Sequence, residues 1–301
     1  MKFATVAIEE RVLVGIVEKK GILSLNDVEE KRSGRRPYAD DLVICLEQED
    51  FLENVKGLIE WVENQNNKDN LFIPIEKAKF LAPIPRPRKN IFCVGKNYEE
   101  HAIEMGSKAD IPEHVMIFTK APTTVIGHMG DIMEHKQVTE QLDYEGELAI
   151  IIGKKGKGIE KEKALDYIFG YTILNDITAR DLQKKHKQFF IGKSLDTTAP
   201  IGPWIVTKDK IPNPNELNII TKVNGEIRQQ SNTKHFIFPI EEIISVLSKG
   251  MTLEPGDIIA TGTPAGVGKG FNPPRFLKAG DSIEISVEGI GTLINQVVAE
   301  E

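Results

Sequence analysis

The short apolar run at residues 148–152 constrains the fold more than any other stretch of the chain. It is rich in β-branched residues, ends at Gly153 and is too short for a helix, so it predicts a buried strand. Glu145 and Glu147 stand at its start, and the alternation of side chains along a strand points both to one face. Two like charges at a buried strand end need a cation or a shared proton. Oxygen ligands of this kind suit magnesium, calcium or manganese.

A third carboxylate, Asp176, strengthens the prediction of a metal site. An isolated Glu-x-Glu at a strand edge is usually a pair of solvated side chains. Asp176, however, closes a second apolar run that begins at Tyr171, just before a predicted helix. A carboxylate at the end of a neighbouring strand would complete a triad of oxygen ligands on one face of a metal ion.

Composition excludes several classes of protein. The chain has 301 residues and a net charge of −7 with both signs interspersed, which argues against a nucleic-acid surface. Cys45 and Cys93 lie far apart without the spacing of a disulfide framework or a zinc motif, so we expect a reducing, cytoplasmic location. No apolar run reaches membrane-spanning length, and charges at residues 9–11 interrupt the N-terminal stretch, so we expect no signal peptide and no membrane partner.

The first 80 residues predict a small module. Residues 1–25 alternate as strands do, and Asn26 with Glu29 is typical of a capping box that opens a short helix. Helical spacing follows at residues 40–64. Three prolines at residues 83–87 then make a stiff, extended connector. We therefore predict a small N-terminal α/β domain at residues 1–80 and a second domain at residues 81–301.

The second portion predicts a strand-rich fold. Asn224-Gly225 is a strong hairpin signal, and a helix is expected between Pro239 and Gly250. Thr178 is expected to cap a helix, with Asp181 three residues later. Many short strands with glycine turns and few helices indicate an α+β, β-rich fold, a mixed β-sandwich or rolled sheet.

Three further groups of residues are candidates for catalysis or substrate binding. His101 and Glu104 lie three residues apart on a predicted helix, so they share one face of it. Such a pair is usually exposed to solvent, but the same spacing also suits a histidine that acts as a general base and is held by the carboxylate. Arg180 and Gln183 follow Asp176 on one helical side, which suits either ordinary helix polarity or the orientation of a carboxylate. Lys193 is either a surface lysine or a fixed charge aimed at an anionic substrate.

The glycine-rich tract at residues 261–270 is not a P-loop. Thr263 stands where the first glycine of that motif is required, and Gly270 stands where serine or threonine is required. We expect instead a loop that brings backbone N–H groups and the Thr263 hydroxyl close to a small anion.

Five motifs, in this order, resemble the fumarylacetoacetate hydrolase family. They are residues 93–105 (Cys-Val-Gly-Lys-Asn-Tyr-Glu-Glu-His-Ala-Ile-Glu-Met), 143–149 (Asp-Tyr-Glu-Gly-Glu-Leu-Ala), 175–183 (Asn-Asp-Ile-Thr-Ala-Arg-Asp-Leu-Gln), 192–196 (Gly-Lys-Ser-Leu-Asp) and 261–268 (Thr-Gly-Thr-Pro-Ala-Gly-Val-Gly). The resemblance covers about residues 80–298, and the first 80 residues resemble the small N-terminal domain of the longer members. It implies a mixed β-sandwich roll, a catalytic second domain and a homodimer.

The resemblance also implies roles for nine residues. One Mg²⁺ or Mn²⁺ per active site would be held by the acidic triad. The implied metal ligands are Glu145, Glu147 and Asp176. The implied catalytic residues are His101, Glu104 and Lys193. The implied contacts to the substrate carboxylate and its oxyanion are Arg180, Gln183, Lys193 and Thr263. On this pattern His101 and Glu104 are catalytic and not merely a solvated helix pair.

The implied chemistry is metal-dependent cleavage of a C–C bond in a small 2-oxo (di)carboxylate through an enolate. We predict oxaloacetate decarboxylation to pyruvate and CO₂ first, because the uninterrupted run at residues 184–193 looks most like the bacterial decarboxylase-type members. Acylpyruvate hydrolysis, with fumarylpyruvate or acetylpyruvate as substrate, is the alternative, as is isomerisation of 2-hydroxyhepta-2,4-diene-1,7-dioate. A metal-binding scaffold protein is the non-enzymatic alternative.

Overall fold

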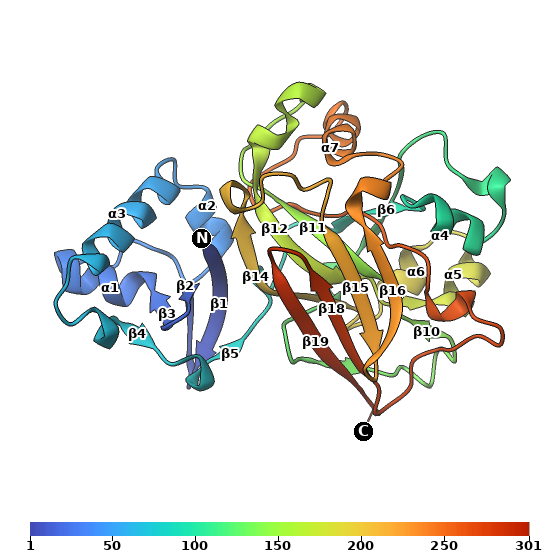
Figure 1. Ribbon diagram of the computed structural model, residues 1–301, viewed down its shortest axis with the longest axis horizontal. Helices are drawn as coiled ribbons and strands as arrows, with labels where there is room; N and C mark the ends of the chain where they lie inside the picture. Colours follow the sequence, from blue (N-terminus) through green and yellow to red (C-terminus); the bar gives the residue numbers. More distant parts are fainter. Residues whose placement is uncertain (301) are drawn as a thin grey trace.

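The computed structural model describes residues 1–300, and its strands form two large sheets (Figure 1). The first sheet has twelve strands, ten of them in the order β4-β3-β2-β1-β14-β12-β11-β17-β6-β7, with β5 paired to β1 and β8 to β14. Its strands are β1 (Lys2–Ile8), β2 (Arg11–Glu18), β3 (Gly21–Ser24), β4 (Phe72–Ile73), β5 (Lys79–Phe80), β6 (Ile91–Gly95), β7 (Met116–Lys120), β8 (Val125–Ile126), β11 (Gly146–Ile152), β12 (Ile168–Asn175), β14 (Ala199–Thr207) and β17 (Ile258–Ala260).

The second sheet has five strands in the order β16-β15-β18-β19-β9, and it lies in front of β11 and β12 in Figure 1. Its strands are β9 (Asp131–Met133), β15 (Asn218–Val223), β16 (Glu226–Asn232), β18 (Ser282–Val287) and β19 (Gly291–Val298). Asn224-Gly225 turns β15 into β16, which confirms the predicted hairpin. A separate two-stranded sheet pairs β10 (Leu142–Asp143) with β13 (Thr178–Ala179).

Side-chain alternation on β11 divides the hydrophobic core in two. Leu148, Ile150 and Ile152 join a core that also contains Ile219 and Ile285 of the second sheet. Ala149 and Ile151 belong to a different core, shared with the N-terminal helices. Strands buried on both faces read as continuous apolar runs, which explains the unbroken run at residues 148–152. Glu147 falls on the same side as Ala149 and Ile151 by this alternation.

Seven α-helices surround the sheets within residues 1–300. They are α1 (Leu25–Ser33), α2 (Leu42–Leu46), α3 (Phe51–Glu63), α4 (Glu99–Glu104), α5 (Arg180–His186), α6 (Phe190–Lys193) and α7 (Ile240–Ser248). The mixture of two packed sheets and few helices confirms the predicted α+β, β-rich class. No helix in this range is long and apolar enough to cross a membrane.

The N-terminal strands extend the first sheet and do not form a separate one. β1 pairs antiparallel with β14, with Phe3 opposite Ile205. Val55 and Leu58 of α3 share a core with Ala149 and Ile151 of β11. Helices α1–α3, drawn in blue in Figure 1, thus cover the face of the sheet toward which the odd-numbered side chains of β11 point. The sheet is continuous across the predicted boundary at residue 80.

Two predicted helix caps are wrong. Helix α1 begins two residues earlier than expected, because the Ser24 side chain, not that of Asn26, accepts a hydrogen bond from the Asp27 N–H. The Asn26 amide is used elsewhere, donating to the Tyr38 carbonyl at 2.6 Å. Thr178 lies in β13, its hydroxyl donates to the Asp176 carbonyl at 2.9 Å, and α5 has no side-chain cap.

Candidate active site

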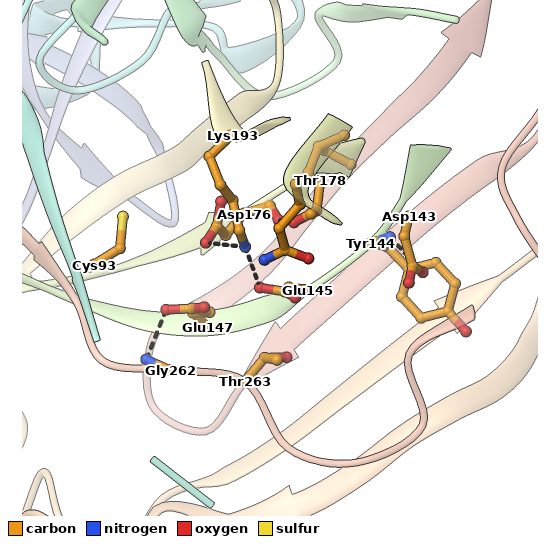
Figure 2. Close-up of polar contacts among 12 residues, drawn as sticks. Cys93, Asp143, Tyr144, Glu145, Glu147, Asp176, Thr178, Lys193, Gly262 and Thr263 are labelled. Carbon is orange, nitrogen blue, oxygen red and sulfur yellow. Dashed lines mark hydrogen bonds and ion pairs between the residues drawn. The ribbon is translucent and has the colours of Figure 1, made fainter. Parts of the chain in front are cut away.

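Antiparallel pairing of β11 and β12 brings the three predicted metal ligands together. Gly146 lies opposite Asn175, so Glu145 and Asp176 flank the end of the pair, and the Asp176 N–H donates to the Glu145 carbonyl at 2.8 Å. One carboxylate oxygen from each of Glu145, Glu147 and Asp176 lies within 4.8 Å of the other two. All three side chains are buried, and Figure 2 shows them close together. This arrangement matches the predicted triad and could hold a metal ion.

Two buried lysines contact the triad. Lys193, at the end of α6, donates from Nζ to Glu145 Oε2 and to Asp176 Oδ2, each at 2.7 Å, as Figure 2 shows. Lys120, at the end of β7, is fully buried; its Nζ lies 2.9 Å from Asp176 Oδ1 and donates to the Ile177 carbonyl at 2.9 Å. Lys193 was predicted from the sequence, but Lys120 was missed, because its only signal is a lysine that closes an apolar strand.

The surroundings shift the pKa values of the two glutamates in opposite directions. Burial alone would raise the pKa of Glu145, but the adjacent Lys193 and Arg180 outweigh it and lower that pKa to about 2. Burial, Asp176 and Glu145 raise the pKa of Glu147 well above its usual range. Glu147 accepts one hydrogen bond, from the Gly262 N–H at 2.7 Å, and contacts neither lysine within hydrogen-bond distance. A divalent cation fits this donor set because it would compensate the charge that the lysines leave unpaired.

Arg180 belongs to the same buried network. Its Nε donates to Asp143 Oδ2 at 2.8 Å, and its Nη1 lies 2.7 Å from Glu145 Oε1. Nη1 also reaches Gln183 Oε1 at 3.4 Å, which joins two of the predicted substrate contacts. Nη2 is buried and has no hydrogen-bond partner among residues 1–300. Asp143, the residue through which this network reaches β10, was not predicted, although it is the next acid before Glu145 in the same motif.

Several N–H groups of the glycine-rich loop bind the chain's own carboxylates, whereas contact of Thr263 with an external anion stays a prediction. The N–H groups of Gly268 and Lys269 donate to Asp143 at 2.6 and 3.0 Å. The Gly266 N–H donates to Glu104 Oε1 at 2.9 Å. The Thr263 hydroxyl donates to the Gly146 carbonyl at 2.9 Å and accepts from Gln229 at 2.8 Å. The loop therefore fixes acidic side chains around the site.

His101 and Glu104 form the predicted contact on α4. His101 Nδ1 lies 3.2 Å from Glu104 Oε2, and both side chains are largely buried. Because Glu104 also accepts the Gly266 N–H, the carboxylate is fixed from two sides. The pair is a positioned histidine and carboxylate, not a solvated helix pair.

One cavity of about 420 Å³ connects the predicted groups. Seven of the nine predicted site residues line it. They are His101, Glu145, Glu147, Arg180, Gln183, Lys193 and Thr263. Asp176 and Glu104 lie behind these side chains, in contact with Lys193 and His101 respectively. Several lysines and apolar residues that were not predicted from the sequence complete the lining, among them Phe118, over whose ring Lys193 Nζ lies at 4.8 Å.

These features agree with a known family of enzymes. Residues 90–298 match the family model described as fumarylacetoacetate (FAA) hydrolase C-terminal. Because that match covers more than half of the chain, the protein belongs to the fumarylacetoacetate hydrolase family, which confirms the resemblance drawn from the five motifs and supports enzymatic activity.

Individual relatives extend the likeness to the whole chain. A protein from Bacillus subtilis named oxaloacetate tautomerase YisK is 55% identical over 300 residues, which is 99% of this chain and 100% of that protein. The structure of a fumarylacetoacetate hydrolase from Exiguobacterium antarcticum superposes with a TM-score of 0.80 at 41% identity, covering all of both chains. A maleylpyruvate hydrolase from Sphingobium sp. SYK-6, solved with manganese(II) and pyruvate, has a TM-score of 0.78 at 29% identity with the same coverage. The predicted fold class is thereby confirmed.

Proposed function

We propose that this protein interconverts the keto and enol forms of oxaloacetate, or of a closely similar 2-oxo dicarboxylate, with a bound Mg²⁺ or Mn²⁺. The observation that carries the proposal is that one cavity joins the buried acidic triad to the His101–Glu104 pair. The full-length identity of 55% to a protein named oxaloacetate tautomerase supports the choice of substrate.

Glu145, Glu147 and Asp176 are the residues that would hold the ion. When bound, the ion supplies a Lewis acid that polarises the 2-oxo group. Its charge also fits the site: Asp143, Glu145, Glu147 and Asp176 carry four negative charges when ionised, and Lys120, Lys193 and Arg180 carry three positive ones, which leaves one negative charge uncompensated. That the maleylpyruvate hydrolase was solved in complex with manganese(II) and pyruvate supports the proposal that this chain binds a metal ion and a 2-oxo acid.

The proton transfer is assigned to His101. Its Nδ1 faces Glu104, so Nε2 is the nitrogen left to accept the proton from C3 of the substrate. The electron pair of the broken C3–H bond forms the C2–C3 double bond, and the C2–O π pair moves onto oxygen. Lys193 Nζ, held beside the triad, is placed to stabilise that negative charge. Return of the proton from His101 to the oxygen gives the enol, and the reverse sequence regenerates the ketone.

Oxaloacetate decarboxylation, the reaction predicted first from the sequence, is the second candidate. It shares the enolate but breaks the C3–C4 bond and releases CO₂, so it needs an electron sink and no base at C3. The fixed His101–Glu104 pair therefore favours proton transfer over plain decarboxylation. In acylpyruvate hydrolysis the same pair would activate water, and the hydrolases among the structural neighbours keep that reaction as a further alternative. The isomerase among them does the same for 2-hydroxyhepta-2,4-diene-1,7-dioate.

The test is an assay of the purified full chain with Mn²⁺ on oxaloacetate, acetylpyruvate and 2-hydroxyhepta-2,4-diene-1,7-dioate. Loss of enol absorbance, release of CO₂ and cleavage of acetylpyruvate are followed separately, with Mn²⁺ alone as the background. We expect enol loss from oxaloacetate to exceed the background far more than CO₂ release does. Faster CO₂ release would favour decarboxylation, and cleavage of acetylpyruvate alone would favour hydrolysis. A scaffold protein would accelerate none of the three reactions.

Three broader expectations accompany this proposal. We propose a homodimer, a cytoplasmic location and the division into residues 1–80 and 81–301. Size-exclusion chromatography with light scattering tests the first, fractionation of the source cells tests the second, and limited proteolysis near residue 80 tests the third.

A further inference from the structure

The cavity has a basic side that the proposed reaction does not use. Lys96, Lys184, Lys187 and Lys269 line the same cavity as the acidic triad, and we call these four residues the lysine rim. They come from three separate parts of the chain: the turn after β6, the end of α5 and the glycine-rich loop. Four lysines converge here in a chain whose net charge is −7.

The rim lysines are largely unpaired. Within residues 1–300, Lys184, Lys187 and Lys269 form no ion pair, and Lys96 pairs with Asp110 at 3.3 Å. Some lysines elsewhere are paired, for example Lys56 with Glu53 at 2.6 Å and Lys161 with Glu242 at 2.8 Å, but many in the described part of the chain are not, so what sets the rim lysines apart is that they line one cavity. The rim therefore keeps positive charge available to an anion in the cavity.

The backbone that carries the rim is held in place, although the residues Lys184, Lys187 and Lys269 are exposed like the control Lys185. The Lys269 N–H is bonded to Asp143, the same carboxylate that holds Arg180. Lys96 and Lys187 have φ angles of +53° and +59°, which are unfavourable for a residue other than glycine and which cluster at functional sites. Beside the rim, Arg180 also lines the cavity, and its buried Nη2 has no partner among residues 1–300.

Lys269 of the lysine rim is affected by the positive charges around it. Burial, followed by Arg180, lowers the pKa of Lys269, and Lys184 and Lys96 contribute in the same direction. Like charges that act on one another in this way are unfavourable unless an anion compensates them. The cavity thus has an acidic floor at the triad and a basic rim.

We propose that the lysine rim binds the second carboxylate of the substrate and so selects 2-oxo dicarboxylates over 2-oxo monocarboxylates. This inference rests on the proposed function, in which the 2-oxo acid end of the substrate lies at the triad. A substrate with a carboxylate at each end matches both sides of the cavity, whereas a monocarboxylate leaves the lysine rim without a counter-charge.

The first test compares oxaloacetate with 2-oxobutanoate, which has a methyl group in place of the second carboxylate. Deuterium exchange at C3 is measured for both substrates with the Mn²⁺-loaded full chain, the Lys184→Met/Lys269→Met double variant and Lys185→Met. Lys185 is the matched control, an exposed lysine on α5 that does not line the cavity. We expect KM for oxaloacetate to rise about tenfold in the double variant, as loss of two partly solvated charge-assisted contacts predicts. Exchange of 2-oxobutanoate should change less than about twofold, and Lys185→Met should resemble the unmodified chain.

Equal loss on both substrates, or no loss on oxaloacetate, would overturn the proposal. If the unmodified chain exchanges neither substrate, the proposed function fails, and calorimetry then tests the lysine rim alone. Malate and oxalate are both dianions, but only malate carries a carboxylate beyond the metal-chelating end. Malate affinity about tenfold weaker in the double variant, with unchanged oxalate affinity, supports the rim. Equal weakening of both, which would mean only a general electrostatic field, or no malate binding at all, contradicts it.

Discussion

Charged side chains form one network around α1 and another around β11. The ion pairs in the two networks have similar lengths, but those around α1 are exposed to water and those around β11 are buried. Near α1, Arg11 lies 2.8 Å from Asp27, and the Arg11 and Asp27 side chains are 60% and 31% exposed. Near β11, Arg180 lies 2.8 Å from Asp143, and these side chains are 2% and 0% exposed. Water screens the first pair and competes for its hydrogen bonds, whereas the second pair must satisfy itself.

Burial, not distance, therefore separates a surface ion pair from a functional cluster in this protein. The α1 network includes Arg36, which contacts both Asp27 and Glu30, so exposed charges alternate in sign around the helix. The site instead leaves Glu147 with no lysine or arginine among residues 1–300 bonded to its carboxylate, and its surroundings raise its pKa. A buried acid with a strongly perturbed pKa beside a cavity is typical of a functional site.

The largest expected effect contrasts Asp143→Asn with Asp27→Asn. Removal of one partner from a buried pair costs about 3–5 kcal/mol of unfolding free energy, whereas an exposed pair is worth about 1 kcal/mol or less. Urea unfolding of both variants in the presence of chelator measures the two losses. Similar losses would mean that burial does not distinguish the two networks.

A second contrast uses two side-chain pairs with the same three-residue spacing. His101–Glu104 is nearly buried beside the cavity, and Glu53–Lys56 is exposed on α3. His101→Ala should lower the rate of enolisation by about a hundredfold or more, because a positioned general base contributes that much. Manganese affinity, measured by calorimetry, should stay within about twofold, and Glu53→Ala should change neither quantity. Full activity in His101→Ala would remove this residue from the mechanism.

The stabilisation that Mn²⁺ gives should depend on the triad near β11 and not on the network near α1. At free Mn²⁺ one hundred times its dissociation constant, the unmodified chain should gain about 2.7 kcal/mol of unfolding free energy. Glu147→Gln should lose most of that gain at the same Mn²⁺ concentration, because the triad loses an anionic ligand. Glu30→Gln, which removes an exposed carboxylate near α1, should keep the whole gain. A gain preserved in Glu147→Gln would place the ion elsewhere.

The smallest effect is the pH dependence of the α1 network. Burial tends to raise the pKa of Asp27, but hydrogen bonds from Arg11, Ser24 and Arg36 outweigh it and lower that pKa below the ordinary value of 3.8. A depressed pKa means that the contribution to stability is present above about pH 3.8 and is lost as the pH falls through the folded-state pKa. The stability difference between the unmodified chain and Asp27→Asn, under about 1 kcal/mol, should therefore shrink toward zero below that pH. A difference that grows in acid would contradict the direction of the shift.

Much of the site could be predicted from local patterns. Glu145 and Glu147 precede one apolar run, and Asp176 follows another. Such runs can be recognised in the sequence. The helix caps were harder to predict, because Ser24 and Asn26 are both good capping residues. The backbone conformation of the folded chain determines which of the two caps α1.

The residues that were missed depend on contacts between distant segments. Lys120 reaches the Ile177 carbonyl across 57 positions of sequence, and Gly268 reaches Asp143 across 125. No spacing rule connects such residues, since the sheet order that joins β7 to β6 and β6 to β17 is set by the whole fold. The lysine rim could not be predicted for the same reason.

The proposed enolisation depends above all on a divalent ion held by the buried triad. The decisive experiment measures the rate of C3 deuterium exchange in oxaloacetate, with the chelator-stripped full chain, as a function of free Mn²⁺ and after subtraction of the rate without protein. We expect exchange to fall to the protein-free rate in chelator and to return on addition of Mn²⁺ to the unmodified chain but not to Glu147→Gln. Equal exchange by the unmodified chain with and without chelator would show that no such ion takes part.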